Sequence, residues 1–235
     1  MDFNVQNMQL TQIITAIGGL GTAAFGLVDA LKSVFSFINR IGLGHIKDVV
    51  TSLAPDQTEA GLPAKPVNTL PRQNILETVE ANWVNGTDVA SQKAIAKSLI
   101  KLHLSAGNAA AVAAKTNVDP DVLGSVAAKN AAGAPLLPEE SDVYSRFDLI
   151  VTAMIDEAYQ LSDQVYRNST RALAMLVAVL LAVVAGWSLE GGGFNLRDGV
   201  LAVLVGLLAT PLAPIAKDLS SALATAVNTM QVVKK

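Results

Sequence analysis

The chain contains no cysteine, only two histidines and few charged side chains. The lack of cysteine excludes disulfide bonds, thiolate metal sites, iron–sulfur clusters and a cysteine nucleophile. The two histidines, His45 and His103, are too few for a histidine-rich metal site. The net charge of −3 provides no basic field that would attract nucleic acid, so we expect no nucleic-acid partner.

The motifs of the common catalytic and cofactor sites are absent as well. The chain has no P-loop, no dinucleotide-binding glycine pattern, no zinc-protease motif and no nucleophile elbow. Residues 191–193 are three glycines, but they follow no strand and so do not predict a phosphate site. We therefore predict a protein that is not an enzyme and that has no cofactor and no metal site.

Charged residues make up 16% of the chain, against about 25% in soluble domains. The deficit lies in three apolar segments, at residues 10–28, 172–189 and 199–216. Each is about as long as one membrane span, which indicates an integral membrane protein with the lipid bilayer as a partner. The second and third segments form a hairpin. The first has no basic residue ahead of it, so we expect a retained segment rather than a cleaved signal peptide.

Between the first segment and the hairpin, the spacing of apolar residues is helical. Residues 55–71 hold four prolines and predict an extended linker, whereas Asp119 and Pro120 form an N-cap and N1 pair. No glycine or proline interrupts residues 139–185, so we expect a long helix over 139–170 that continues into the second span.

These patterns predict an all-α integral membrane protein with three transmembrane helices and a small helical cytoplasmic domain. The expected parts are a glycine-rich transmembrane helix at 1–40, an amphipathic stretch and proline-rich linker at 41–71, the helical domain at 72–170, a transmembrane hairpin at 171–217 and an amphipathic tail at 218–235.

The positions of lysine and arginine predict the orientation. They gather after the first segment, before the second and after the third, whereas the hairpin loop holds only Arg197. The positive-inside rule then places residues 41–170 and the C-terminus in the cytoplasm and the N-terminus outside. The alanine-rich, cysteine-free composition is typical of a bacterial protein, which suggests the inner (plasma) membrane.

Small residues recur along one side of the first segment. Gly18, Thr22, Gly26 and Ala30 repeat every four residues, with further small residues beside them. Such a face allows membrane helices to pack backbone against backbone. The pattern therefore predicts helix association, and it leaves open whether the partner is another subunit or the chain's own hairpin.

The long helix carries an apolar seam in which spacings of four and three residues alternate. Its residues are Phe147, Val151, Met154, Ala158, Leu161 and Val165. This 3.5-residue repeat is typical of a helix that packs along another helix. The partner is either another helix of the same chain or a second subunit in a coiled coil. Packing within the chain is favoured, because three heptads are the minimum for a coiled coil.

Two features of the membrane segments have both a structural and a functional interpretation. Asp29 and Lys32 are ionisable residues in an apolar stretch, and they are either a candidate ion site or a pair at the membrane interface. Pro211 and Pro214 predict either a kink near the interface or a hinge. We favour the interface pair and the kink.

Lys93, Lys97 and Lys101 form a stripe along one helix face. They could contact anionic lipid head groups. Alternatively, they form a solvated face or pair with the acidic long helix, which we favour because no aromatic residue interleaves them.

Our leading hypothesis is a non-enzymatic, self-associating membrane protein that acts as a structural or assembly subunit, a homo-oligomer built through the small-residue face and the seam. An oligomeric pore or channel is the first alternative, with Thr15, Thr22, Asp29, Lys32 and Thr210 as its polar candidates. The second alternative is an accessory subunit bound to another membrane protein.

Overall fold

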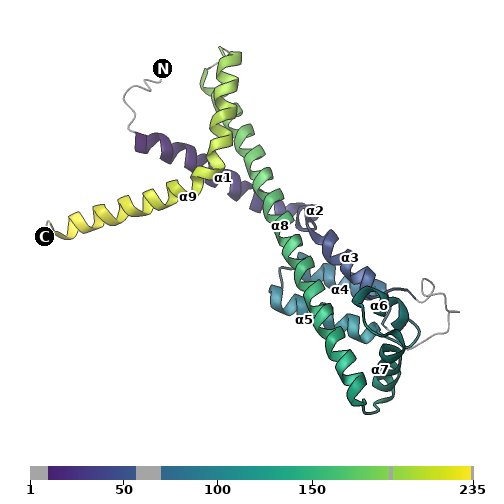
Figure 1. Ribbon diagram of the computed structural model, residues 1–235. Helices are drawn as coiled ribbons and strands as arrows, with labels where there is room; N and C mark the ends of the chain where they lie inside the picture. The colour runs from purple at the N-terminus through teal and green to yellow at the C-terminus, as the bar shows by residue number, and fades with distance from the viewer. Residues whose placement is uncertain (1–9, 57–69, 191–192, 234–235) are drawn as a thin grey trace. The chain divides into compact units, whose positions relative to one another are not determined.

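A computed structural model describes residues 10–56, 70–190 and 193–233 of the chain (Figure 1). Within these ranges every regular element is an α-helix. The helices belong to two compact units. We call residues 36–166 the central unit, and we call the parts of the chain before Ser36 and after Tyr166 the spanning unit. Most of the proline-rich linker predicted over 55–71 lies outside the described residues.

The spanning unit contains α1 (Leu10–Val34), the second part of α8 (Pro138–Glu190) and α9 (Leu196–Val233). All three helices are long and apolar enough to cross a membrane, which confirms the prediction of three such segments. Many of their large apolar side chains are exposed, as expected of a surface that faces lipid tails. Examples are Leu176, Leu180 and Val184 on α8 and Leu201, Leu204 and Leu208 on α9.

Glycines bring the helices of the spanning unit into backbone contact. A Cβ atom at Gly21 would overlap the carbonyl oxygen of Ala209, and a Cβ at Gly18 would overlap Ala216. On the hairpin, a Cβ at Gly206 would lie 2.7 Å from the backbone nitrogen of Val179. Membrane helices associate mainly through such close contact, because lipid is as apolar as their side chains. These three glycines therefore determine how α1 and α8 pack on α9.

The third membrane helix continues through both of its prolines. Pro211 and Pro214 lie inside α9, and Figure 1 shows that the helix changes direction along its length. Proline removes a backbone donor and clashes with the preceding turn, which bends a helix without ending it. The two prolines therefore account for the bend. A bend here agrees with the kink that we favour from the sequence.

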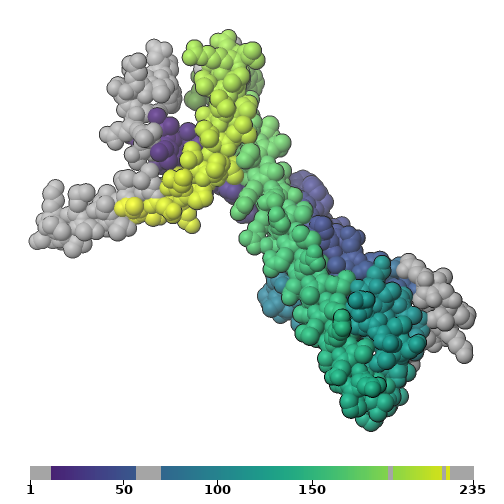
Figure 2. Space-filling model, in the orientation of Figure 1, coloured from purple at the N-terminus to yellow at the C-terminus, as the bar shows by residue number. Residues whose placement is uncertain are grey.

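The central unit is a bundle of short helices around the first part of α8. They are α2 (Ser36–Asn39), α3 (Leu43–Leu53), α4 (Arg72–Val84), α5 (Val89–His103), α6 (Ala109–Thr116) and α7 (Pro120–Ala132). Figure 2 shows the side chains of α6, α7 and α8 closing over one end of this unit. The largest fully buried apolar side chains of its core are Ile46, Leu53, Ile75, Ile100, Leu123, Phe147 and Val151. Burying one such side chain stabilises the fold by about 1.5–3 kcal/mol.

Local sequence explains how several of these helices begin and end. Asp88 caps α5 by accepting from the backbone nitrogen of Ser91 at 2.9 Å. Asp119 caps α7 and Pro120 occupies its first turn, which confirms the predicted pair. Gly133 ends α7 with a φ of +65°, a conformation that favours glycine.

One glycine allows α3 to pack against α8. Gly42 caps α3 with a φ of +90°, and a Cβ atom there would overlap the carbonyl oxygen of Ser162. Both the backbone conformation and the space therefore require glycine.

Replacing Gly42 with alanine is expected to lower the free energy of unfolding of the central unit by about 2 kcal/mol or more, because strain and collision add. Thermal unfolding of the full chain, followed by Trp83 fluorescence in a Trp187→Phe background, measures the effect. Gly44→Ala is the matched control, since a Cβ there meets no described atom within 4 Å. Equal stability of the two variants would contradict the close approach of α3 to α8.

Candidate functional site

Helix α1 has two faces of small residues with different environments. The face formed by Gly18, Gly21, Ala24 and Val28 is buried against the hairpin. On the opposite side, Gly19 and Gly26 are exposed, and a Cβ atom added to either would meet no described atom within 4 Å. The exposed small residues on this side are Thr15, Gly19, Thr22, Ala23, Gly26 and Ala30, which we call the open face.

The predicted small-residue stripe is divided between these two faces. Gly18 packs on α9, whereas Thr22, Gly26 and Ala30 are exposed. A helix has 3.6 residues per turn, so positions four apart drift steadily around it. The hydroxyl of Thr22 donates to the carbonyl oxygen of Gly18 at 3.0 Å, which satisfies it within the helix. The open face is therefore smooth, and it bears no acidic or basic side chain between Thr15 and Val28.

Asp29 and Lys32 lie together on α1. Lys32 Nζ is 2.9 Å from Asp29 Oδ1, and the Asp29 side chain is 72% exposed. A lysine in the last turn of a helix also interacts favourably with the negative end of its dipole. The two charges therefore pair with each other, and their position at the membrane interface stays a prediction. An ion site at these residues stays a prediction.

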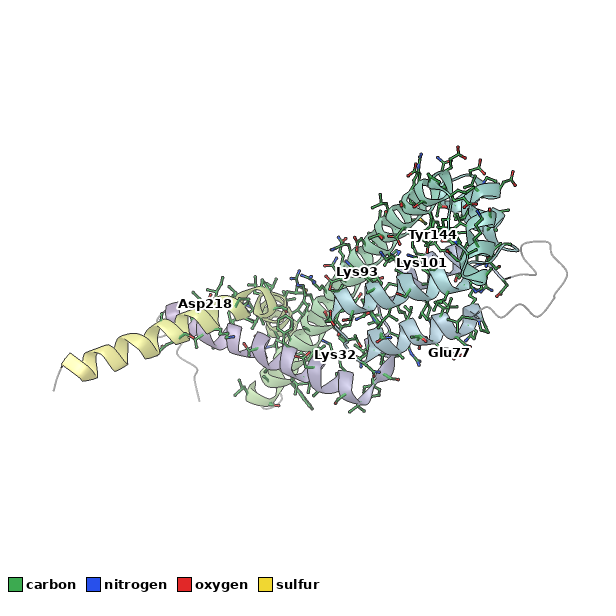
Figure 3. All side chains as sticks on the ribbon, turned by 90° about the horizontal axis from the view of Figure 1, so that it is seen from below. Lys32, Glu77, Lys93, Lys101, Tyr144 and Asp218 are labelled. Carbon is green, nitrogen blue, oxygen red and sulfur yellow. The ribbon has the colours of Figure 1, made fainter. Side chains whose placement is uncertain are left out.

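The three lysines of the predicted stripe lie on the side of α5 that faces α8 (Figure 3). Lys93 Nζ is 2.9 Å from Asp156 Oδ1. Lys97 and Lys101 both reach Asp148, at 3.1 Å and 2.9 Å. The stripe thus pairs with the acidic long helix, and lipid contact by these lysines stays a prediction.

Asp148 and Lys101 also affect each other's titration. The hydrogen bond from Lys101 is the main cause that lowers the pKa of Asp148. Partial burial acts to lower the pKa of Lys101, but hydrogen bonds to Asp148 and Tyr144 outweigh it and raise that pKa. Lys101 Nζ further lies 4.8 Å from the centre of the Tyr144 ring, which adds a cation–π contact (Figure 3). Both groups therefore stay charged at neutral pH.

The apolar seam of α8 packs within the chain over its first part. Phe147, Val151 and Ala158 are buried and Met154 is half-buried in the core of the central unit. Leu161 and Val165 remain 40% and 38% exposed. The first four seam residues therefore have the intrachain environment that the sequence favours, and a coiled coil between subunits stays a prediction.

Sequence reasoning missed two clusters of polar residues that join distant elements. His103 is buried, with Nδ1 2.7 Å from the carbonyl oxygen of Leu70 and Nε2 2.9 Å from that of Pro55. This ring joins the chain on the two sides of residues 57–69. Glu80 of α4 contacts Arg40, in the turn between α2 and α3, at 2.8 Å and Lys47 of α3 at 2.6 Å. The spacing of apolar residues in the sequence indicates the buried faces of α4 and α5, but it does not indicate these polar contacts.

A third polar cluster closes the turn between α7 and α8. Glu140 accepts hydrogen bonds at 2.7 Å from the backbone nitrogen of Leu137, from Ser125 and from Lys129. The bond from Leu137, followed by those from Lys129 and Ser125, lowers the pKa of Glu140 to about 2. Its carboxylate is therefore a structural acceptor. Among the described residues, no group of three histidine or acidic side chains is placed to hold a metal ion.

A scan against protein-family models and searches of curated proteins and of solved structures found no match to this chain. The function must therefore be argued from its own residues.

The Glu140 cluster predicts a stability that falls in acid. Folding lowers the pKa of this carboxyl from 4.5 to about 2, so the native state binds fewer protons than the unfolded state between these values. Its contribution is present above pH 4.5 and is lost as the pH falls toward 2.

We expect Glu140→Gln to lower the thermal midpoint at pH 7 and to make the acid dependence shallower, as measured by Trp83 fluorescence in the Trp187→Phe background. Glu139→Gln is the control, because that neighbouring carboxyl is exposed. An unchanged acid slope in Glu140→Gln would show that the cluster does not form.

Proposed function

We propose that this chain is a non-enzymatic assembly subunit of a membrane, which self-associates through the open face of α1. The observation that carries the proposal is the placement of Gly19 and Gly26, where an added Cβ atom would meet no described atom within 4 Å, although the glycines of the opposite face pack tightly. Glycine costs about 1 kcal/mol relative to alanine inside a helix. On a face that only meets lipid, larger apolar residues would serve better, so a second helix is the occupant that explains these glycines.

The physical basis of the association is contact area at short range. A face of glycine, alanine and threonine lets two helix backbones approach closely, and the many weak dispersion contacts then add up. A second copy of α1 offers the same smooth face, which fits the self-complementary interface of a symmetric dimer. The proposal therefore includes a homo-oligomer with α1 at its centre.

In the same proposal, the central unit lies on the cytoplasmic side of a bacterial inner membrane. The support is the concentration of lysine and arginine beside residues 41–170 and after the third span. The second span would continue directly from the long helix of the central unit, since no glycine or proline interrupts residues 139–185. Assembly in the membrane would then bring several central units together.

No specific observation favours a channel. Of its polar candidates, Asp29 and Lys32 pair with each other, Thr22 bonds to its own helix, and Thr210 is buried. An experiment can distinguish an accessory subunit from a self-assembling one. Purification from native membrane would then show a foreign protein at fixed stoichiometry instead of a second copy.

The test measures association in liposomes. The chain has no cysteine, so an Asn130→Cys substitution on the exposed side of α7 allows donor and acceptor dyes to be attached to full-length protein. Energy transfer is recorded as the lipid-to-protein ratio increases. We expect the double variant Gly19→Leu, Gly26→Leu to raise the dissociation constant at least tenfold, which corresponds to about 1.4 kcal/mol.

Leu176→Phe is the matched control, because it adds bulk at a side chain on α8 that is already 58% exposed. It should associate like the unsubstituted chain. Gly21→Leu should instead disrupt the packing of α1 on α9 and lower the thermal stability. A monomer at every lipid ratio, or a double variant that associates normally, would reject the open face as the interface.

A further inference from the structure

The central unit contains a pocket of about 250 Å³, lined by both apolar and polar side chains, that the assembly role does not use. It lies where the C-terminal end of α4 meets α2, α5 and α8. Side chains at its wall are Asn39, Trp83, Thr87, Gln92, Asp163 and Tyr166. The volume is just below the usual range for ligand sites, about 300–1,000 Å³, and so suits a small chemical group.

Gln92 is the most informative residue of the pocket. Its side chain is only 4% exposed, and its Nε2 atom donates to the carbonyl oxygen of Thr87 at 2.5 Å. This bond determines which way the amide points, because a carbonyl oxygen accepts only from the nitrogen end. The other end, Oε1, is buried and has no donor among the described residues. Buried acceptors are normally paired, so this oxygen points to a donor from outside the chain.

Two donors at the wall bond within the protein. Trp83 Nε1 donates to the carbonyl oxygen of Asn39 at 2.9 Å, and the Thr87 hydroxyl donates to Asn82 Oδ1 at 3.0 Å. Neither of them therefore pairs with Gln92 Oε1, which stays the buried acceptor without a described donor at this pocket.

Three further features favour positive charge in the pocket. Asp163 brings a carboxylate to the wall, and Val84, at the end of α4, brings the negative end of a helix dipole. Trp83 and Tyr166 place their rings edge to face, with centres 6.1 Å apart. Aromatic faces of this kind attract organic cations more than they attract metal ions, which need several oxygen ligands.

We propose that this pocket binds an organic ammonium group, with Gln92 Oε1 as acceptor, Asp163 as counter-charge and Trp83 and Tyr166 as aromatic walls. The ammonium group belongs either to a zwitterionic phospholipid head group or to a small soluble amine. The lipid source is consistent with the chain path, because Asn39 and Tyr166 lie close in sequence to the two places where the chain passes between its units.

Trp83 lies at the wall, so its fluorescence in the Trp187→Phe background reports binding. Full-length protein in nanodiscs of phosphatidylglycerol is titrated with ethanolamine, whose ammonium group can donate to Gln92 Oε1, and, separately, with propan-1-ol, a neutral molecule of the same shape. We expect a saturable change with ethanolamine and none with the neutral analogue. Nanodiscs containing phosphatidylethanolamine form the second arm. A shift in this lipid without added amine identifies the head group as the ligand.

Asp163→Asn and Gln92→Met should each weaken ethanolamine binding at least fivefold. Glu157→Gln removes one charge from an exposed position on the same helix and should bind ethanolamine normally. Thermal unfolding of each variant identifies any that fails to fold, and Tyr166→Leu provides a further test of the wall. No saturable response in either arm, equal binding of the neutral analogue, or normal binding by both Asp163→Asn and Gln92→Met would overturn the proposal.

Discussion

In the spanning unit, α1 approaches α9 so closely that only a hydrogen atom fits at the side-chain positions of Gly18 and Gly21. Lipid tails are as apolar as the helices, so burial alone does not hold the helices together, and short-range contact must do so. The chain enters the central unit after α1 and leaves it within α8. The packing of α1 on the hairpin therefore holds together the two parts of the chain that come before and after the central unit in the sequence. It also decides which face of α1 is left open.

In the central unit, charged contacts align α5 along α8. The three lysines of α5 reach Asp148 and Asp156, in helical register with the apolar contacts beneath. Half-exposed pairs of this kind contribute about 0–1 kcal/mol each, far less than a buried core residue such as Phe147. A slip of α5 by one turn would separate several pairs at once. Their main effect is therefore to select one alignment of the two helices.

The sequence predicts the three apolar helices and the cap at Asp119, because these depend on composition and neighbouring residues. It cannot say which glycines of α1 pack inside the chain, since Gly18 and Gly19 are adjacent and only the position of α9 separates their roles. Along α8 the core also includes residues beside the predicted seam. A helix turns every 3.6 residues, so Ile155 and Tyr159 are buried while Leu161 of the seam is partly exposed. Contacts between distant elements, such as those of His103, leave no local pattern.

Buried polar groups of the central unit differ in how well they are satisfied by described partners. At the start of α8, every hydrogen bond to the Glu140 carboxylate comes from a close donor, as a purely structural site requires. Around Trp83, the Tyr159 hydroxyl and Gln92 Oε1 are buried without a described partner, and burial raises the pKa of Tyr159 to about 12. Unpaired buried atoms cost stability, and proteins tend to retain them where function requires it. The Glu140 carboxylate therefore has the surroundings of a structural site, whereas Gln92 Oε1 has those that the proposed pocket requires.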